Sequence, residues 1–375
     1  MYKKSRPLLT IGIPTFNRCL FLKRSLDSIV AQIGEFKYEV EICISDNNST
    51  DNTEEVVSKF REKYPSIIRY NINKDNLGFD RNLLKVISMA KGKFIWLLGD
   101  DDQIAKEGLR QVIKLIRERD KLTLGMIIGR RKSFFINKRT GEKTVYEITV
   151  DVNKPEIFKI DRDKIIDPQF TDSAFISVQI FNNFLVKQTI NRNQSIIEKG
   201  IGTGFIHTLI YRLMFLKCNW IKGYILNKII TYQEMSYYKN IIESSFILLC
   251  GKEKIEDLLL LSAYPETSYN NIISTRKSNH RKRFLIDMGL KKAFNILNYN
   301  SYIGCIQLFI KHSSFLYGLT LITTFTILLV IPSSILKIIY KILYKIKYGN
   351  SWKSKWIKKS IIFSNMSRGE RIQII

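Results

Sequence analysis

Residues 94–102 read Phe-Ile-Trp-Leu-Leu-Gly-Asp-Asp-Asp, an apolar run that ends in three adjacent carboxylates. A short run of branched and aromatic residues is typical of a buried β-strand. Comparable runs occur earlier in the chain, at residues 8–13, 40–45 and 67–72, and apolar residues at helical spacing lie between them. This alternation predicts an α/β fold in which helices flank a mostly parallel central sheet.

Each of the four runs is followed directly by a polar cluster. The clusters are Pro14–Arg18, Asp46–Asp51, Asn73–Asn82 and Gly99–Asp102. Since the carboxyl ends of parallel strands meet at one edge of a sheet, these clusters predict a ligand site there. None of them is a G-x-G-x-x-G or G-x-x-x-x-G-K-[ST] loop, which disfavours a dinucleotide-binding Rossmann site and a P-loop.

The carboxylates of Asp100, Asp101 and Asp102 are the sharpest chemical feature of the chain. Adjacent carboxylates repel one another, and burial beside an apolar strand raises their pKa values. A divalent cation relieves both effects, and Mn²⁺ or Mg²⁺ is held by one or two carboxylates together with substrate phosphates and water. In an extended segment Asp100 and Asp102 point to one side, so one can contact a ribose or a metal while the other holds the cation. A solvated acidic turn is the alternative.

In order, the four segments resemble the family 2 glycosyltransferases of GT-A fold, and especially the abequosyltransferase-like members of bacterial polysaccharide pathways. The motifs that carry this resemblance are T-I-G-I-P-T-F-N-R, I-S-D-N-N-S-T-D-N-T, N-L-G-F-D-R-N and F-I-W-L-L-G-D-D-D. The resemblance implies a nucleotide-sugar donor, and a metal that stabilises the departing diphosphate would serve such a transfer.

The resemblance also implies roles for individual residues. It implies that Pro14, Thr15 and Asn17 contact the nucleoside, and that Asp46 contacts the base with help from Asn48 and Ser49. It implies that Gly78 and Arg81 lie beside the ribose and diphosphate, and that Asp100 and Asp101 contact the substrate. It also implies that Asp100 and Asp102 form the metal-binding pair, with Asp102 as the direct ligand. Three simpler interpretations remain open: Asn17 as a helix cap, Asp46 as a turn cap and Arg81 as a surface cation.

The residue that activates the acceptor is harder to predict. Inverting members of the family carry an acidic Glu-Asp pair before a helix that ends in Arg-Leu. Here Arg212 and Leu213 are present but no such pair precedes them, and His207 stands near the expected place. Histidine is a suitable general base near neutral pH, although a packed core histidine is the alternative. Asp172 and Glu198 are the other candidates, and both inversion and retention stay open.

Composition and charge set the wider frame. The chain has 375 residues and a net charge of +26, and its 45 % hydrophobic and 12 % aromatic content excludes global disorder. Five scattered cysteines without a C-x-x-C pair argue against a disulfide framework and a structural zinc site, and favour a reducing compartment. The basic excess keeps open attraction for nucleic acid, anionic lipid or polyanionic substrates.

The C-terminal region predicts membrane association. Residues 313–336 lack charged side chains, and Lys337 to Ile375 carry a net +9 on a segment with amphipathic helical spacing. Pro14 ends the first apolar run too early for a signal peptide, so we expect the N-terminus to stay in the cytoplasm. Since the basic tail should also face the cytoplasm, a monotopic or re-entrant hairpin bent near Pro332 fits best. A buried core helix followed by a solvated basic helix is the alternative.

These observations divide the chain into three regions. Residues 1–235 are the expected GT-A catalytic domain, with a nucleotide-sugar half (1–125) and an acceptor half (126–235). Residues 236–312 are an expected helical region, and residues 313–375 the membrane-association tail.

The expected function is metal-dependent transfer of a sugar from a nucleotide donor to a glycan acceptor. We expect this acceptor to be lipid-linked and the reaction to take place at the cytoplasmic face of the inner membrane. The alternatives are a nucleotidyltransferase with paired aspartates and Mg²⁺, and a basic nucleic-acid-binding protein.

Overall fold

The computed structural model describes residues 6–119, 123–136, 143–161, 165, 175–234, 255, 258, 259 and 332–348. The chain divides into two compact units. The first contains residues 1–134, 147–235 and 258–263, and the second contains residues 135–146, 236–257 and 264–375. Asp172, most of the region 236–312 and the apolar segment 313–331 lie outside the described residues, so the predictions made for them stay predictions.

Strands and helices alternate through the first half of the chain, as the apolar pattern predicts. The strands are β1 (Leu9–Thr15), β2 (Val40–Asp46), β3 (Ile68–Ile72), β4 (Phe94–Leu97), β5 (Asp102–Ile104), β6 (Leu124–Ile136), β7 (Lys143–Ile148), β8 (Ile157–Ile160), β9 (Gln179–Asn182) and β10 (Lys222–Glu234). The α-helices are α1 (Cys19–Val30), α2 (Thr53–Lys63), α3 (Phe79–Met89), α4 (Gly108–Arg119), α6 (Asn183–Arg192), α7 (Gln194–Gly200), α8 (Ile206–Lys217) and α13 (Ser333–Tyr348). Short 3₁₀ helices cover Gly34–Phe36 and Ile176–Val178.

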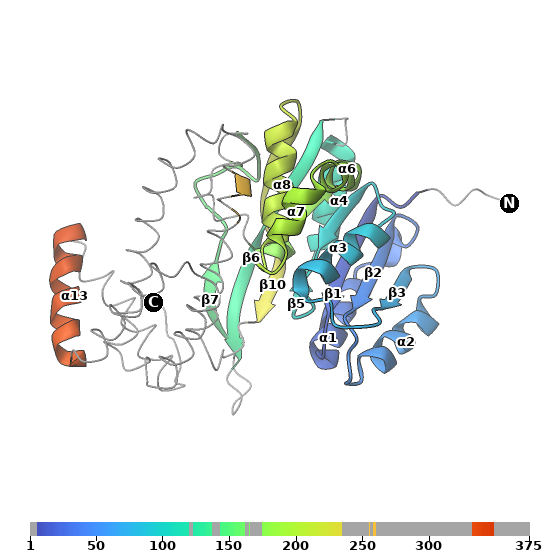
Figure 1. Cartoon of the computed structure of the whole chain (residues 1–375), viewed down its shortest axis with the longest axis horizontal. Helices are drawn as coiled ribbons and strands as arrows, with labels where there is room; N and C mark the ends of the chain where they lie inside the picture. The colour runs from blue at the N-terminus through green and yellow to red at the C-terminus, as the bar shows by residue number, and fades with distance from the viewer. Residues whose placement is uncertain are drawn as a thin grey trace. The chain divides into compact units, whose positions relative to one another are not determined.

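The central sheet is mixed, which corrects the expectation of a mostly parallel sheet. Its strand order is β3-β2-β1-β4-β9-β6-β10-β5. Figure 1 shows the first three of these strands, β3, β2 and β1, side by side. The first four strands are parallel, as predicted, but β9 lies antiparallel between β4 and β6. Strands β5 and β8 are antiparallel to β10. An apolar run predicts that a strand is buried, whereas its direction depends on how the chain returns to the sheet.

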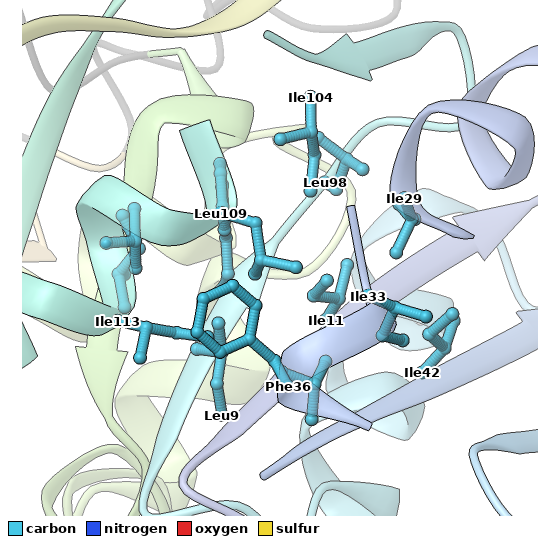
Figure 2. Packing of buried hydrophobic residues seen from close by; sticks show 14 of the residues in the cluster. Leu9, Ile11, Ile29, Ile33, Phe36, Ile42, Leu98, Ile104, Leu109 and Ile113 are labelled. Atoms are coloured by element: carbon cyan, nitrogen blue, oxygen red, sulfur yellow. The ribbon is translucent and has the colours of Figure 1, made fainter. Parts of the chain in front are cut away.

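Helices cover both faces of the sheet. Leu9 and Ile11 of β1 point into a core with Ile29 of α1 and with Leu109 and Ile113 of α4 (Figure 2). Helix α3 packs against β1 and β2 on the opposite face and contacts α6 and α8. Because successive side chains of a strand alternate between faces, strands buried on both sides read as continuous apolar runs. The core thus holds all four carboxyl ends of the parallel strands at one edge.

In the second unit, α13 confirms the helical spacing predicted at the start of the basic C-terminal segment, over Ser333–Tyr348. Ile335, Ile338, Ile339 and Ile342 recur at helical spacing, and each side chain is between 41 % and 59 % exposed. Lys337, Lys341 and Lys345 are also exposed. Helix α13 is therefore amphipathic.

Among the described residues, we find no helix with the length and apolar content that a bilayer crossing requires.

Candidate functional site

The end of β1 meets the carboxylate triplet. The Thr15 hydroxyl donates a 2.8 Å hydrogen bond to Asp100 Oδ2. The Arg18 guanidinium contacts Asp100 Oδ1 at 3.2 Å and Asp101 Oδ2 at 2.7 Å. Asp100 is almost fully buried, whereas about half of the Arg18 side chain is exposed. The first and fourth polar clusters of the sequence thus form one site.

Asp102 is held separately from the other two carboxylates. It begins β5, is 2 % exposed, and accepts a hydrogen bond from the Ser177 hydroxyl. The same hydroxyl accepts 2.8 Å from the backbone N–H of Gly99. Ser177 belongs to the 3₁₀ helix before β9, so a segment far along the chain completes the carboxylate site.

Burial changes the acid–base properties of the site. It raises the pKa of Asp100 to about 6, although the neighbouring Arg18 lowers it. Burial also raises the pKa of Asp102 well above its usual value, and the charge of Asp101 acts in the same direction. Two buried carboxylates whose charged forms are disfavoured would gain from a nearby cation.

The donor set suits a hard divalent cation. No group of three or more His, Cys, Asp or Glu side chains in the described part of the chain is arranged as a metal centre. Mg²⁺ and Mn²⁺ do not need one, since one or two carboxylates, substrate phosphates and water suffice. Asp100 and Asp102 offer buried carboxylate oxygens with raised pKa values, and they fit this requirement.

The end of β2 carries a second hydrogen-bonded group. Asp46 Oδ1 accepts from the backbone N–H of Ser49 at 2.9 Å and from its hydroxyl at 2.6 Å. The Tyr70 hydroxyl donates to Asp46 Oδ2 at 2.6 Å, and burial with this bond raises the pKa of Tyr70. Tyr70 therefore remains a neutral donor, and Asp46 is fixed as an acceptor. Asp46 does close a turn, as the simpler interpretation held, while keeping lone pairs for a further donor.

The first and second polar clusters are bonded to each other. Asn17 Oδ1 accepts from Thr50 N at 2.7 Å, and the Asn17 N–H donates to Ser49 Oγ at 2.9 Å. Asn17 and Asn48 both have positive φ, at 52° and 67°. Pro14 is buried in β1 and pairs in register with Ser45 of β2. Asn17 thus joins two loops. It is not the cap residue of α1, which is Arg18, and the Arg18 side chain forms no capping hydrogen bond.

The third cluster lies at the start of α3. Gly78 precedes the helix with φ 77°, and its N–H donates to Asn76 Oδ1 at 2.9 Å. Arg81 forms an ion pair with Glu198 of α7, and both side chains are about half exposed. Two residues predicted for different roles, one for diphosphate and one for the acceptor base, are therefore paired with each other.

His207 is the second residue of α8. It is 4 % exposed, and its ring lies 5.9 Å from that of Phe205. Arg212, on the same helix, is also buried. His207 is thus a packed side chain near the start of a helix, and its catalytic role stays a prediction.

Comparison with known families identifies the domain. Residues 10–183, which run from β1 to the start of α6, match Glycosyl transferase family 2. This segment is a family 2 glycosyltransferase domain. It contains both Thr15 and the carboxylate triplet.

Curated relatives match the glycosyltransferase domain over part of their length. The abequosyltransferase RfbV of Salmonella typhimurium is 46 % identical over 102 residues, which are 27 % of this chain and 30 % of the relative. The GalNAc(5)-diNAcBac-PP-undecaprenol beta-1,3-glucosyltransferase of Campylobacter jejuni is 34 % identical over 113 residues, 30 % of this chain and 35 % of the relative. The chain thus spans about a third of the length of the curated relatives it matches.

Solved structures share the GT-A-like fold. Staphylococcus aureus TarS 1-349 in complex with UDP-GlcNAc superposes with a TM-score of 0.53 at 17 % identity, over 98 % of this chain and 94 % of that one. A mannosyltransferase from Pyrobaculum calidifontis in complex with GDP-Man and Mn²⁺ gives 0.50 at 12 % identity, over 97 % and 87 %. At these identities the likeness concerns the fold alone.

Three residues that bond to the predicted carboxylates, Arg18, Tyr70 and Ser177, were not predicted as site residues from the sequence. Arg18 stands inside the first polar cluster, so its position after a strand was a usable signal. Tyr70 lies within a strand and Ser177 in a 3₁₀ helix 75 residues after Asp102. No local pattern links either residue to its carboxylate partner, because the link is made by the sheet.

Proposed function

We propose that this chain transfers a glycosyl group from a nucleotide sugar to a glycan acceptor in bacterial surface polysaccharide synthesis. The observation that carries the proposal is the hydrogen bond between Thr15 and Asp100, since it joins the first and fourth family motifs within a family 2 glycosyltransferase domain. The names of two relatives, an abequosyltransferase and a glucosyltransferase, support this reaction class.

Mn²⁺ or Mg²⁺ is the proposed cofactor, held by Asp100 and Asp102. Bound there, the cation would neutralise charge on the leaving diphosphate. Arg18 adds a half-exposed guanidinium beside Asp100, suited to phosphate oxygens. Asp46, kept an acceptor by Tyr70 and Ser49, would take a hydrogen bond from an N–H of the nucleobase. The Mn²⁺ complex of the mannosyltransferase of the same fold supports the choice of metal.

His207 is our first candidate for the acceptor-activating base. Glu198 is second, because its carboxylate is already paired with Arg81. Asp172 is the third candidate and rests on the sequence alone.

The proposed acceptor is a lipid-linked saccharide at the cytoplasmic face of the plasma membrane. One relative is named for a substrate on PP-undecaprenol. Helix α13 presents exposed isoleucines together with lysines, a combination suited to an anionic lipid surface. Attachment there would keep the chain close to a lipid-borne acceptor.

A panel of nucleotide sugars, each with Mn²⁺ or Mg²⁺, tests the proposal through binding and donor hydrolysis. We expect one donor to bind in a metal-dependent manner, and Asp102→Asn to abolish that metal-dependent binding. Asp27→Asn is the matched control, since Asp27 is exposed on α1 and forms a 2.7 Å ion pair with Lys23. Full metal-dependent activity in the Asp102 variant would contradict the metal assignment. Tight oligonucleotide binding with a steep salt dependence, and no donor binding, would favour the nucleic-acid alternative.

A further inference from the structure

Asp80 is a buried carboxylate that the proposed chemistry does not use. It is the second residue of α3 and only 3 % exposed. Asp80 Oδ2 accepts from the backbone N–H of Gly204 at 2.9 Å, and Oδ1 accepts from that of Ile206 at 3.3 Å. A residue of the nucleotide-sugar half thus holds the loop that leads into α8, more than 120 residues later in the chain.

Helix α8 depends on this contact for its N-terminal cap. Its own cap residue, Phe205, supplies no side-chain hydrogen bond, so the first backbone N–H groups need another acceptor. Asp80 provides one, and its negative charge suits the positive end of the helix. The preceding loop has φ of 84° at Gly202 and 72° at Gly204, conformations that glycine adopts without strain.

The loop has a second, internal fastening. The Thr203 hydroxyl donates to the carbonyl of Gly200 at 2.8 Å and accepts from Phe205 N at 3.1 Å. Asp80 and Thr203 therefore act on the same short segment from two sides.

Helix α3 is itself fixed at the nucleotide edge of the sheet. Asn82 Nδ2 donates to the carbonyl of Ser45 at 3.0 Å, which places the first turn of α3 over the end of β2. At the other end of the helix, Lys187 Nζ of α6 donates to the carbonyl of Ala90 at 2.7 Å. Figure 1 shows α3, α6, α7 and α8 grouped together, and α3 contacts both α6 and α8. Since α3 is anchored at both ends, the loop that is hydrogen-bonded to Asp80 is anchored through this helix to the sheet.

We infer that Asp80 is a positioning residue: from the nucleotide-sugar half it fixes the 202–206 loop and the start of α8, and with them His207, at the edge where the donor binds. The inference deepens the proposed function and rests on it for the catalytic consequence. It also places a carboxylate at the N-terminus of α8, which disfavours binding of the donor diphosphate there.

Hydrogen exchange on Asp80→Asn tests the anchoring without reference to any activity. The amide keeps one oxygen but turns an NH₂ group toward a backbone N–H, so one of two charge-assisted bonds is lost. We expect exchange at residues 204–207 to rise about tenfold or more, with β1 to β4 unchanged. Asp51→Asn is the matched control: Asp51 accepts from Cys19 N at 2.9 Å and Thr53 N at 3.1 Å, so its effect should stay near α1 and α2. Unchanged exchange at 204–207 in Asp80→Asn would overturn the inference.

Turnover separates positioning from a purely structural role. With a donor found in the nucleotide-sugar panel, we expect Asp80→Asn to bind it with a Kd within about twofold of the parent, while kcat falls about tenfold or more. Faster exchange with an unchanged kcat would show that Asp80 only caps the helix and would overturn its role in positioning His207 for catalysis. If the parent chain binds no nucleotide sugar, the proposed function fails, and the exchange data still decide the anchoring. If Asp80→Asn does not fold, Thr203→Val replaces it, because this variant removes the hydrogen bonds within the same loop. The same rise in exchange at residues 204–207 and the same fall in kcat are then expected.

Discussion

The hydroxyl of Ser177 donates a hydrogen bond to the buried carboxylate of Asp102. Ser177 is fully buried, and its carbonyl accepts a 2.8 Å bond from Trp96 Nε1, so the serine is held from two sides. The bond favours the charged form of Asp102 against the effect of burial. Ser177 thus helps to fix the position of a proposed metal ligand and favours its charged form.

Removing this hydroxyl should weaken cation binding. In Ser177→Ala, Asp102 loses its donor and the Gly99 N–H loses its acceptor, so we expect the Mn²⁺ Kd to rise about tenfold, as for other supporting residues of metal sites. Titration calorimetry or manganese EPR measures this directly. Ser88→Ala is the control, because that hydroxyl donates only to the Lys85 carbonyl in its own helix. Equal Kd values for all three proteins would contradict the role of Ser177.

A methyl group at Gly99 should disturb the carboxylates. A Cβ there would meet Asp102 Oδ2 at 2.9 Å and Asp101 Oδ1 at 3.1 Å. We expect Gly99→Ala to lower Mn²⁺ affinity at least as much as Ser177→Ala, with a small loss of thermal stability. Gly34→Ala is the matched control, since a Cβ at Gly34 meets nothing within 4 Å. Parent-like affinity in Gly99→Ala would mean that the carboxylates do not hold the cation in this arrangement.

The raised pKa of Asp100 predicts a dependence of stability on pH. Because the pKa in the folded chain is about 6, above the usual 3.8, the folded state binds the proton more tightly. The stability contributed by protonated Asp100 is present in acid and is lost as pH rises from about 4 to about 6, by up to about 3 kcal/mol. Urea unfolding of the parent and of Asp100→Asn should show the parent losing free energy of unfolding relative to the variant as pH rises through this range, and only there. A difference independent of pH would contradict the shift.

Tyr70 should matter for nucleotide binding through Asp46. Tyr70→Phe removes the donor to Asp46 Oδ2 and leaves that carboxylate held through Oδ1 by Ser49, so we expect the Kd of the donor nucleotide to rise several-fold, equivalent to about 1 kcal/mol. Tyr38→Phe is the control, since Tyr38 is 76 % exposed. If both variants bind like the parent, Asp46 is not a base contact.

Charge reversal on α13 should release the chain from anionic lipid. Each lysine near such a surface contributes about 1 kcal/mol, so Lys337→Glu with Lys341→Glu should reduce binding to phosphatidylglycerol-containing vesicles by well over tenfold. Sedimentation with vesicles measures the bound fraction, and neutral phosphatidylcholine vesicles supply the control. Retained binding by the double variant would remove α13 from the membrane proposal.

The proposed donor site was largely predictable from local patterns. Short apolar runs predicted β1 to β4, and the polar clusters behind them predicted the edge where Thr15, Asp46 and Asp100 lie. This prediction is reliable for parallel strands, because their carboxyl ends all lie at one edge of the sheet. The direction of β9 was not predictable, and the expectation of a mostly parallel sheet was wrong, since four-residue strands carry no signal of orientation.

By itself, then, the sequence determined the strand–helix order, the family and the carboxylate triplet, because these depend on residues close together in the chain. Only the tertiary structure decided which partners the buried carboxylates have. Asp102 pairs with Ser177 across 75 residues, and Asp80 with the loop before α8 across more than 120. A buried carboxylate must find donors to offset its lost hydration, but which distant segment supplies them depends on strand order and helix packing, which no local pattern records.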